Sequence, residues 1–506
     1  MIITKIPSAK IVGIQGVETI VEVGIQDGLG IHVVGLVSSA VKSSLMRTMT
    51  ALQSQGFRIP GKKIVINIAP ADLHKSDAGY DLPIAVGVIA ASGQRELPLA
   101  SKFIIVGELG LDGSLRPVRG AVAFAQLAVE KGYEGIILPA KSALEVADFH
   151  DIAVYGAESL ADALRILSGE DCQDLLACNS KKHNTNAVDA VDAVDLCDIP
   201  GHEFEKRALE IAAAGGHNLL MLGSPGTGKG LLAKALVGIL PPMSREEALQ
   251  IRTIYSVKGN NNRLDIQRPF RSPHFSASLA AMLGGGPDLE PGEVTLANGG
   301  VLYLNEMGEM PKSVLEALRV PIEDHKVCLC RLKGKVEYPS SFMLVAASNL
   351  CPCGYWGVDD RCTCTPSQRK NYMDRLSGPV MDHLDIQIAV SQMSQTPAAS
   401  DTKPESSSVV AERVEKAREI QRIRFADETF STNAEMDSKL INKYCPLDEQ
   451  CKDTLQKTVS MMNLLPRAYS RIVKLARTIA DLEGSKDIKP EHLVEASVYR
   501  YLDKVS

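Results

Sequence analysis

The segment from Gly223 to Gly230 constrains this chain more than any other feature of its sequence. A strand that feeds a glycine-rich turn at a helix N-terminus directs backbone N–H groups and the positive end of the helix dipole at one spot, where phosphates bind. The apolar run 218–222 before the segment and the helix-like run 231–237 after it fit this layout. The sequence therefore predicts a phosphate-binding loop inside an α/β domain. Its residues are Gly223, Ser224, Pro225, Gly226, Thr227, Gly228, Lys229 and Gly230.

The last residue of this loop departs from the usual pattern. Lys229 would place a positive charge on the β- and γ-phosphates of a nucleotide, and the next residue is normally Ser or Thr, whose hydroxyl binds Mg²⁺. Gly230 has no side chain that could do this. We therefore expect the loop to bind nucleotide, and we expect hydrolysis to be impaired.

Length and composition limit the remaining possibilities. A chain of 506 residues is long enough for about three domains of roughly 100 to 200 residues each. The net charge of -6 means that any contact with nucleic acid needs a local basic surface. The longest apolar run, 82–91, is too short to cross a bilayer, and the N-terminus lacks the apolar core of a signal peptide. We expect a cytoplasmic protein with mostly reduced cysteines.

Changes in composition divide the chain into four regions. Residues 1–170 alternate strand-like and helix-like segments and predict an α/β domain, whereas 171–197 is polar and repetitive, which favours a linker over a binding motif. The nucleotide-binding α/β domain is expected at 198–395, and a helical domain at 396–506. The clearest strand-like segments of the first region are 17–23, 63–68, 103–106 and 135–138, and the clearest helix-like segments of the chain are 38–55, 412–424, 464–483 and 490–502.

A second motif follows the apolar run 300–304, which predicts a buried parallel strand. Asn305 and Glu306 come directly after it. In working nucleotide hydrolases the first of two acids at this place holds Mg²⁺ and the second orients the attacking water. The run alone would fit any buried strand, but its position after a phosphate loop favours this motif, with the neutral Asn305 in place of the first acid.

Two further polar residues fit a nucleotide site. Asn349 follows the strand-like run 342–347, as a residue that senses the γ-phosphate would, although an Asn after a strand is commonly a turn residue. Arg467 lies near the start of a helix-like segment, at the place of an arginine that reaches back to the phosphates. The alternative for Arg467 is a solvated arginine on a helix face.

Four cysteines form two close pairs. Cys351 and Cys353 are followed, after eight residues, by Cys362 and Cys364. This separation allows four thiolates to converge on one tetrahedral Zn²⁺, although the commonest spacing within each pair is Cys-x-x-Cys. The alternative is a loop with reduced cysteines and no metal.

These residues resemble, over nearly the whole chain, the Mg-chelatase-like AAA+ proteins of the YifB/ComM family. The resemblance implies a Lon-protease-like N-terminal domain (S5 domain 2-like), an AAA+ core with a parallel sheet and a C-terminal helical lid. It also implies ATP as the nucleotide, a cysteine cluster of the zinc type, a ring that we expect to be a homo-hexamer, and, for ComM-like members, ATP-driven branch migration of DNA in natural transformation. The segments that carry it are 69–73, 80–85, 116–120, 206–218, 268–274, 351–355 and 476–482.

The departures from the family pattern fall where hydrolysis is carried out. The family has Ser or Thr at the place of Gly230, Asp at the place of Asn305 and an arginine at the place of His383, apparently the finger that enters a neighbouring subunit's site. A neutral His cannot reproduce the fixed charge and planar fork of an arginine. We therefore expect ATP binding with little dependence on Mg²⁺, and slow or absent hydrolysis.

The N-terminal domain also departs from its model. The serine nucleophile of Lon-type peptidases is missing, with Gly79 or Tyr80 in its place, and no lysine follows Gly120 where the partner base would lie. We expect a substrate-binding or assembly module with no peptidase activity.

Two hypotheses follow for the whole chain. In the first, the chain is a ring-forming member of the family that binds adenine nucleotide and acts on single-stranded or branched DNA; Lys229 neutralises phosphate charge, Glu306 orients water, and Asn349 with Arg467 senses the γ-phosphate. In the second, it is a catalytically degenerate scaffold that responds to nucleotide, or a subunit of a mixed ring. A Mg-chelatase subunit is a distant third. The candidate DNA contacts are Lys258, Arg263, Arg268 and Arg271, for which a solvated loop is an equal interpretation.

Overall fold

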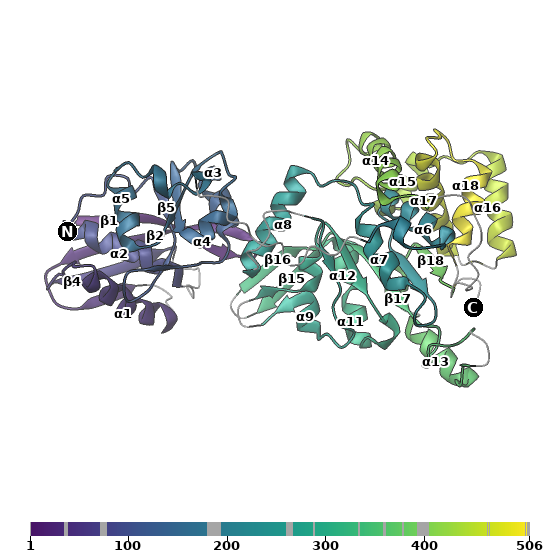
Figure 1. Cartoon of the computed structure of the whole chain (residues 1–506), viewed down its shortest axis with the longest axis horizontal. Helices are drawn as coiled ribbons and strands as arrows, with labels where there is room; N and C mark the ends of the chain where they lie inside the picture. Colours follow the sequence, from purple (N-terminus) through teal and green to yellow (C-terminus); the bar gives the residue numbers. More distant parts are fainter. Residues whose placement is uncertain are drawn as a thin grey trace. The chain divides into compact units, whose positions relative to one another are not determined.

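The structure is a computed structural model, and its described residues form two compact units (Figure 1). Unit 1 comprises Met1–Val188, Ala248–Ile266 and Cys328–Tyr338, and unit 2 comprises Asp189–Glu247, Gln267–Val327 and Pro339–Ser506. The described residues are 2–34, 39–70, 78–179, 194–259, 267–286, 289–331, 334–357, 361–376, 379–391, 404–462, 464, 466–500 and 502.

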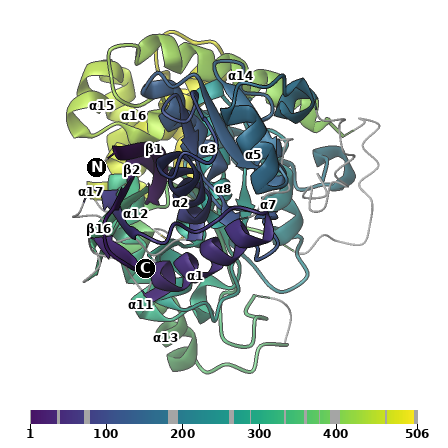
Figure 2. The ribbon, with the colours of Figure 1, turned by 90° about the vertical axis from the view of Figure 1, so that its left-hand side faces the viewer.

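Unit 1 contains a four-stranded sheet in the order β1-β2-β4-β3. Strand β2 pairs with β1 on one side and with β4 on the other, both antiparallel, and β3 pairs with β4 in parallel. Alternate residues of β4 point to the core, so that Ile64, Ile66 and Ile68 are fully buried, as expected of a half-buried strand with a period of two. Helix α2 packs against β1 and β2, and α3 packs against β2 (Figure 2). The bounds are β1 Ile2–Val12, β2 Gln15–Gln26, β3 Ile31–Val34, α1 Ser39–Ser54, β4 Lys63–Ala69, α2 Asp81–Ala91 and α3 Ala121–Glu130.

A second sheet of unit 1 is parallel, with the order β5-β8-β9. Helix α5 follows it and begins with a capping box, in which Ser159 and Asp162 satisfy each other's backbone N–H groups. The bounds are β5 Phe103–Ile105, β6 Glu108–Leu109, β7 Leu115–Arg116, β8 Gly135–Pro139, α4 Ala140–Ala143, β9 Ala153–Ala157 and α5 Leu160–Leu167.

Two later segments of the chain also belong to unit 1. They are the part of α8 (Arg245–Lys258) from Ala248 onward and most of the hairpin of β15 (Lys326–Arg331) and β16 (Gly334–Pro339). Within unit 1, Arg252 of α8 forms an ion pair of 2.6 Å with Asp148. The sequence predicts one uninterrupted nucleotide-binding domain at 198–395. It gives no sign that two segments within this range pack in unit 1.

The region around the expected linker contributes residues to both units. Cys172 and Ala177 are buried in the cores of unit 1, and Leu196 is buried in the core of unit 2. Residues 180–193, the middle of the expected linker, lie outside the described part of the chain. The boundaries of the four predicted regions and the Lon-like character of the first domain stay predictions.

Unit 2 is built on a five-stranded parallel sheet in the order β11-β14-β17-β10-β18. Strands β10, β14 and β17 are buried at every residue, which is typical of a parallel sheet covered on both faces. The predicted α/β class with a parallel sheet is therefore confirmed. The bounds are β10 Leu219–Leu222, β11 Phe270–Arg271, β14 Val301–Leu304, β17 Met343–Ser348 and β18 Ile386–Ala389.

Helices complete unit 2. Those that flank the sheet or lie in its connections are α6 Glu203–Gly215, α7 Lys229–Val237, α9 Leu279–Leu283, α10 Glu293–Leu296, α11 Lys312–Ala317, α12 Arg319–Asp324 and α13 Pro366–Leu376. Those of the predicted helical region are α14 Ser407–Arg424, α15 Ser438–Tyr444, α16 Glu449–Met461, α17 Pro466–Leu482 and α18 Pro490–Val498. Two short strands, β12 Gly284–Gly285 and β13 Glu290–Pro291, form an antiparallel pair.

No helix within the described ranges is both long and apolar enough to cross a membrane.

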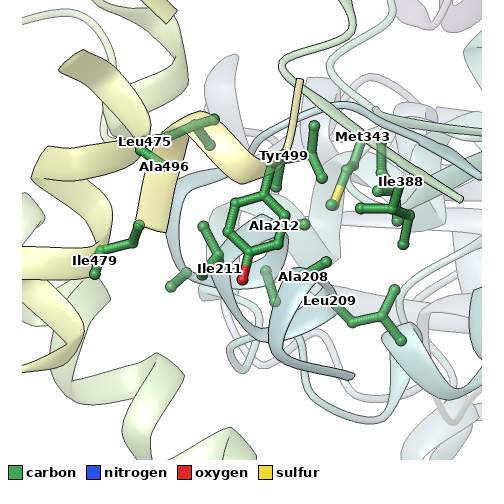
Figure 3. Packing of buried hydrophobic residues seen from close by; sticks show 14 of the residues in the cluster. Ala208, Leu209, Ile211, Ala212, Met343, Ile388, Leu475, Ile479, Ala496 and Tyr499 are labelled. Carbon is green, nitrogen blue, oxygen red and sulfur yellow. The ribbon is translucent and has the colours of Figure 1, made fainter. Parts of the chain in front are cut away.

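The C-terminal helices and the sheet share one hydrophobic core. Figure 3 shows Tyr499, which follows α18, among Ala208, Ile211 and Ala212 of α6. Tyr499 is 2% exposed, and its ring stacks on Phe204 with centroids 5.2 Å apart. Such an aromatic pair contributes about 0.5 to 1.5 kcal/mol beyond the burial of its surface. The small alanines of α6 leave room for the ring, so this contact packs the end of α18 against α6.

A buried polar chain connects the same parts. His217 lies just before β10, and its two ring nitrogens lie 3.0 Å from an Asp385 carboxylate oxygen and 2.8 Å from the Thr478 hydroxyl on α17. The arrangement resembles the acid-histidine-hydroxyl set of a hydrolase. All three residues are buried, however, and the imidazole and the Thr478 hydroxyl are fully enclosed. We assign them a structural role, because a substrate could not reach the hydroxyl.

Candidate nucleotide-binding site

The phosphate loop of the sequence forms the turn between β10 and α7. Gly228, the residue before the helix, has φ of 84°, in the left-handed region that glycine adopts without a steric penalty. The Nζ atom of Lys229 donates hydrogen bonds to the carbonyl oxygens of Gly223 at 2.7 Å and Ser224 at 2.8 Å. The Thr227 hydroxyl also donates to Ser224, at 3.0 Å. These bonds hold the ammonium group over the helix N-terminus, where anions bind.

A cavity of about 510 Å³ opens beside this loop. It is lined by the loop and by residues at the carboxyl ends of β14 and β17, including Asn305, Glu306 and Asn349. In open parallel sheets, ligands bind at this edge. The structure therefore brings the predicted loop, Asn305, Glu306 and Asn349 together around one cavity, while their roles in binding stay predictions.

Glu306 enters this cavity through an unusual backbone conformation. Its φ is 55°, which is uncommon for a residue other than glycine and is found in tight functional turns. Asn305, one residue earlier, is exposed. Among the described cavity residues Glu306 is the one carboxylate, so the site has less negative charge than a pair of acids would give.

Tyr303 is a cavity residue that the sequence reasoning missed. Its hydroxyl donates a hydrogen bond of 3.2 Å to the Asn305 side-chain oxygen. Tyr303 lies on strand β14, which ends at Leu304, and Asn305 follows two positions after Tyr303, the spacing at which residues of an extended chain share a face. This spacing is the signal that could have found Tyr303.

Position 230 is open on the side of the cavity. A Cβ atom built on Gly230 would have the Tyr303 hydroxyl oxygen as its nearest neighbour, at 3.8 Å, an ordinary contact distance. A Cβ atom therefore fits there without displacing any of the described residues. The loss of the usual hydroxyl is a change of chemistry that leaves the loop geometry in place.

Burial lowers the pKa of the Lys229 ammonium to about 8, and the nearby Glu306 carboxylate only partly offsets this effect. A bound phosphate chain would raise this pKa again, because it stabilises the charged form. Below pH 8 the lysine is charged both with and without nucleotide. Above pH 8 Lys229 is largely neutral when no nucleotide is bound, and it must take up a proton on binding.

We expect ATP affinity to fall as the pH rises above about 8, by up to tenfold per pH unit, because each binding event then takes up one proton. Calorimetry at pH 9 in two buffers with different ionisation enthalpies measures this uptake. Lys234→Met, on the same helix and at the same cavity, serves as the control and should keep the pH dependence. An affinity that stays constant between pH 7 and pH 9.5 would contradict the assignment to Lys229.

Two further phosphate contacts are expected, from Asn349 and Arg467, and the structure describes the side chain of Asn349 only. The Ser348 hydroxyl donates to the Asn349 carbonyl oxygen at 3.1 Å, so the end of β17 forms a closed turn that presents Asn349 to the cavity. Arg467 belongs to α17, and its side chain lies outside the described part of the structure. Its contact with the phosphates stays a prediction.

His383 lies at the end of a short 3-10 helix, Pro379–His383. Its Nε2 atom lies 3.2 Å from a Glu323 carboxylate oxygen, and the same carboxylate accepts a hydrogen bond of 2.8 Å from Arg319. His383 is not among the described residues that line the cavity. Its expected place in a neighbouring subunit's site stays a prediction.

The four cysteines of the predicted zinc site converge. Their four sulfur atoms lie within 4.8 Å of one another. The separations are 3.4 Å for Cys351 and Cys353, 3.8 Å for Cys351 and Cys362, and 3.7 Å for Cys353 and Cys362. A tetrahedral zinc with Zn–S bonds of about 2.3 Å requires sulfur atoms about 3.8 Å apart. The donor set therefore fits a structural zinc ion, which would close this loop.

The cysteine loop touches the phosphate loop. Gly354 has φ of 84°, and a Cβ atom built on it would approach the ring carbons of Pro225 to 2.9 Å. Such a distance excludes any side chain unless Pro225 moves. The backbone of the cysteine loop therefore lies directly against the phosphate loop.

Two of the four candidate DNA contacts are engaged within the protein. Arg268 donates to the carbonyl oxygens of Pro241 and Gly299, each at 2.7 Å. Arg271 forms a two-point ion pair with Glu293, with distances of 2.7 and 2.8 Å. Lys258 ends helix α8, and Arg263 lies outside the described residues. The two arginines have structural partners, so they give little support to a DNA surface at this place.

Family models match most of the chain. The model for magnesium chelatase, subunit ChlI, matches residues 195–398, that for subunit ChlI of Mg-chelatase matches 21–142, and that for the C-terminal part of the same subunit matches 404–500. The first match contains the phosphate loop, Asn305, Glu306 and the cysteine cluster.

Full-length relatives give the same assignment. Protein YifB of Salmonella typhimurium is 41% identical over 498 residues, which cover 97% of this chain and 96% of the relative. Competence protein ComM of Haemophilus influenzae is 40% identical over 493 residues, which cover 96% of this chain and 95% of the relative. Protein YifB of Escherichia coli is 40% identical over 510 residues, which cover 97% and 96%. With this identity over nearly the whole length, the chain belongs to the Mg-chelatase-like YifB/ComM family.

Proposed function

We propose that this chain is an ATP-binding AAA+ protein that binds adenine nucleotide in the cavity beside the phosphate loop and hydrolyses it slowly or not at all. The observation that carries the proposal is the convergence of Lys229, Glu306 and Asn349 on one cavity of about 510 Å³. Lys229 supplies positive charge for the phosphates, and Glu306 supplies the one carboxylate that could orient a water. The missing hydroxyl at Gly230 and the neutral Asn305 weaken the hold on Mg²⁺.

This proposal predicts a nucleotide affinity that depends only weakly on Mg²⁺. In the unchanged protein, ATP titrated with Mg²⁺ and with excess EDTA should give similar dissociation constants, because the two usual protein contacts of the ion are absent. Lys229→Met should abolish binding in both conditions, whereas Lys234→Met should keep it. Calorimetry gives both constants. Binding that requires Mg²⁺ would contradict the proposal.

The proposed cellular activity is action on DNA as a homo-hexameric ring. Its support is the family, since one relative carries the name competence protein ComM. Within the proposal, nucleotide binding organises the ring and the ring encloses or remodels single-stranded or branched DNA. Sedimentation of the protein with and without ATP tests the ring, and migration of a labelled four-way junction tests the activity.

A second candidate is a nucleotide-responsive subunit of a mixed ring or a scaffold. The observation that favours it is that Gly230, Asn305 and His383 stand where the resemblance leads us to expect two Mg²⁺ contacts and an arginine finger. In a mixed ring, a subunit that binds ATP without hydrolysing it can still complete its neighbour's site. Junction migration by the purified protein alone favours the first candidate. An inert protein that binds ATP and forms rings favours the second.

A further inference from the structure

Tyr303 presents a hydroxyl at the position where the phosphate loop lacks one. The Tyr303 hydroxyl oxygen is the nearest atom to the space that a Cβ on Gly230 would occupy, at 3.8 Å. The hydroxyl of a Ser or Thr at 230 would extend one bond further into the same space. Two separate parts of the chain, β14 and the start of α7, are therefore complementary at this point.

The ring of Tyr303 is held firmly. Tyr303 is 5% exposed, and its ring stacks on Phe270 of the neighbouring strand β11, with centroids 5.7 Å apart and an interplanar angle of 25°. Strand β11 pairs with β14 in parallel, which places Phe270 and Tyr303 on adjacent strands. Both residues line the cavity. The packed ring fixes the direction of its hydroxyl, which is the polar end of the side chain.

The hydroxyl is paired with the residue that replaces the usual acid. It donates to the Asn305 side-chain oxygen at 3.2 Å. Half a turn of the amide would bring the NH₂ group to the phenol oxygen and free the phenol proton for a phosphate oxygen. Burial, followed by the charge of Glu306, raises the pKa of the phenol to about 12, so it remains a neutral donor.

We infer that Tyr303 is a nucleotide-binding residue whose hydroxyl takes over the place left by Gly230, and that the neutral Tyr303–Asn305 pair contacts the β- or γ-phosphate of a nucleotide that carries no tightly held Mg²⁺. The inference rests on the proposed function, since it concerns the same cavity. It goes further in naming the group that replaces the metal contacts, and it makes metal-free nucleoside triphosphate a ligand of this site.

A double-mutant cycle tests this role. Tyr303→Phe keeps the ring and its stacking on Phe270 but removes the hydroxyl. In excess EDTA it should weaken ATP binding about three- to tenfold, the usual effect of one hydrogen bond. Gly230→Thr supplies a hydroxyl from the other side, so in that background Tyr303→Phe should change the affinity less than about twofold. Such a difference between the two backgrounds is a coupling between positions 230 and 303.

Three controls separate the possible causes. Gly230→Ala adds bulk without a hydroxyl and should leave the effect of Tyr303→Phe unchanged. Tyr469→Phe removes a hydroxyl from an exposed tyrosine of α17 and should leave the affinity unchanged. Thermal unfolding of Tyr303→Phe checks that the fold is retained, and Asn305→Ala provides a second variant, which removes the partner and should also weaken metal-free binding.

The outcomes distinguish this inference from the proposed function. If the unchanged protein binds no ATP, both are wrong. If it binds ATP and Lys229→Met abolishes the binding, but Tyr303→Phe has no effect or has the same effect in both backgrounds, the proposed function stands and the role of Tyr303 is wrong.

Discussion

The variant with Gly230→Thr, Asn305→Asp and His383→Arg is expected to release phosphate from ATP on the order of 10³-fold faster than the unchanged chain. An arginine finger alone is worth about 10³ to 10⁵ in rate. The other two changes restore the hydroxyl and the carboxylate that hold Mg²⁺. The three changes supply the three groups that we propose the site lacks, and we expect their effects to be strongly cooperative, because the finger stabilises charge only on a correctly held phosphate.

Positions 230 and 305 have room for their new side chains, and position 383 offers a partner for an arginine. A side chain at 230 has open space, with the Tyr303 hydroxyl 3.8 Å from its Cβ atom. Asp has nearly the same shape as Asn, and Asn305 is exposed at the cavity. At position 383, an arginine could pair with Glu323, which His383 approaches to 3.2 Å. Glu306 and Asn349, to which we assign roles in hydrolysis, already line the cavity.

Steady-state phosphate release with Mg²⁺ checks this expectation, for the unchanged protein, each single variant and the triple variant. Adding Glu306→Gln to the triple variant is the matched control and should remove most of the recovered rate, because it removes the carboxylate expected to orient the attacking water. Robust turnover by the unchanged protein would show that the three positions do not disable it. A triple variant that binds Mg²⁺ and ATP but stays inactive would place the defect elsewhere in the fold.

The local elements of the fold could largely be predicted from the sequence. The strand predicted at 63–68 is Lys63–Ala69, the helix predicted at 38–55 is Ser39–Ser54, and the helix predicted at 464–483 is Pro466–Leu482. Each has a clear period and a clear end, because the pattern is set by which face meets the core. The phosphate loop could be predicted for the same reason, since its glycines and lysine act through neighbouring backbone atoms.

Features that depend on distant parts of the chain could not be predicted. The last helix was expected at 490–502 but ends at Val498, because Tyr499 turns into the core and Arg500 bridges to Gln387 of β18. The Tyr303 hydroxyl lies close to Gly230, and Gly354 lies against Pro225. Both approaches join segments that are far apart in sequence. Only the packing of the sheet brings them together.

Loss of one cysteine of the predicted zinc site is expected to lower both the zinc content and the nucleotide affinity. Cys353→Ser should lower the zinc content from about one ion per chain to a small fraction, because a structural zinc site requires all four of its ligands. It should also weaken nucleotide binding by about tenfold. The backbone at Gly354 lies against the Pro225 ring, so a loop that is no longer closed by metal stops supporting the phosphate loop. Ordering even one residue again on binding costs about 1 to 2 kcal/mol.

Metal analysis and ATP titration of the same samples separate the two effects. Cys330→Ser, at an exposed cysteine of β15, is the control and should change neither the zinc content nor the affinity. A strong zinc chelator added to the unchanged protein should reproduce the affinity loss of Cys353→Ser, and added zinc should reverse it. If Cys353→Ser loses zinc but binds ATP as tightly as before, the contact between Gly354 and Pro225 does not support the phosphate loop. Since Cys351 follows Asn349 by two residues, the same loss of closure should also disturb the residue expected to contact the γ-phosphate.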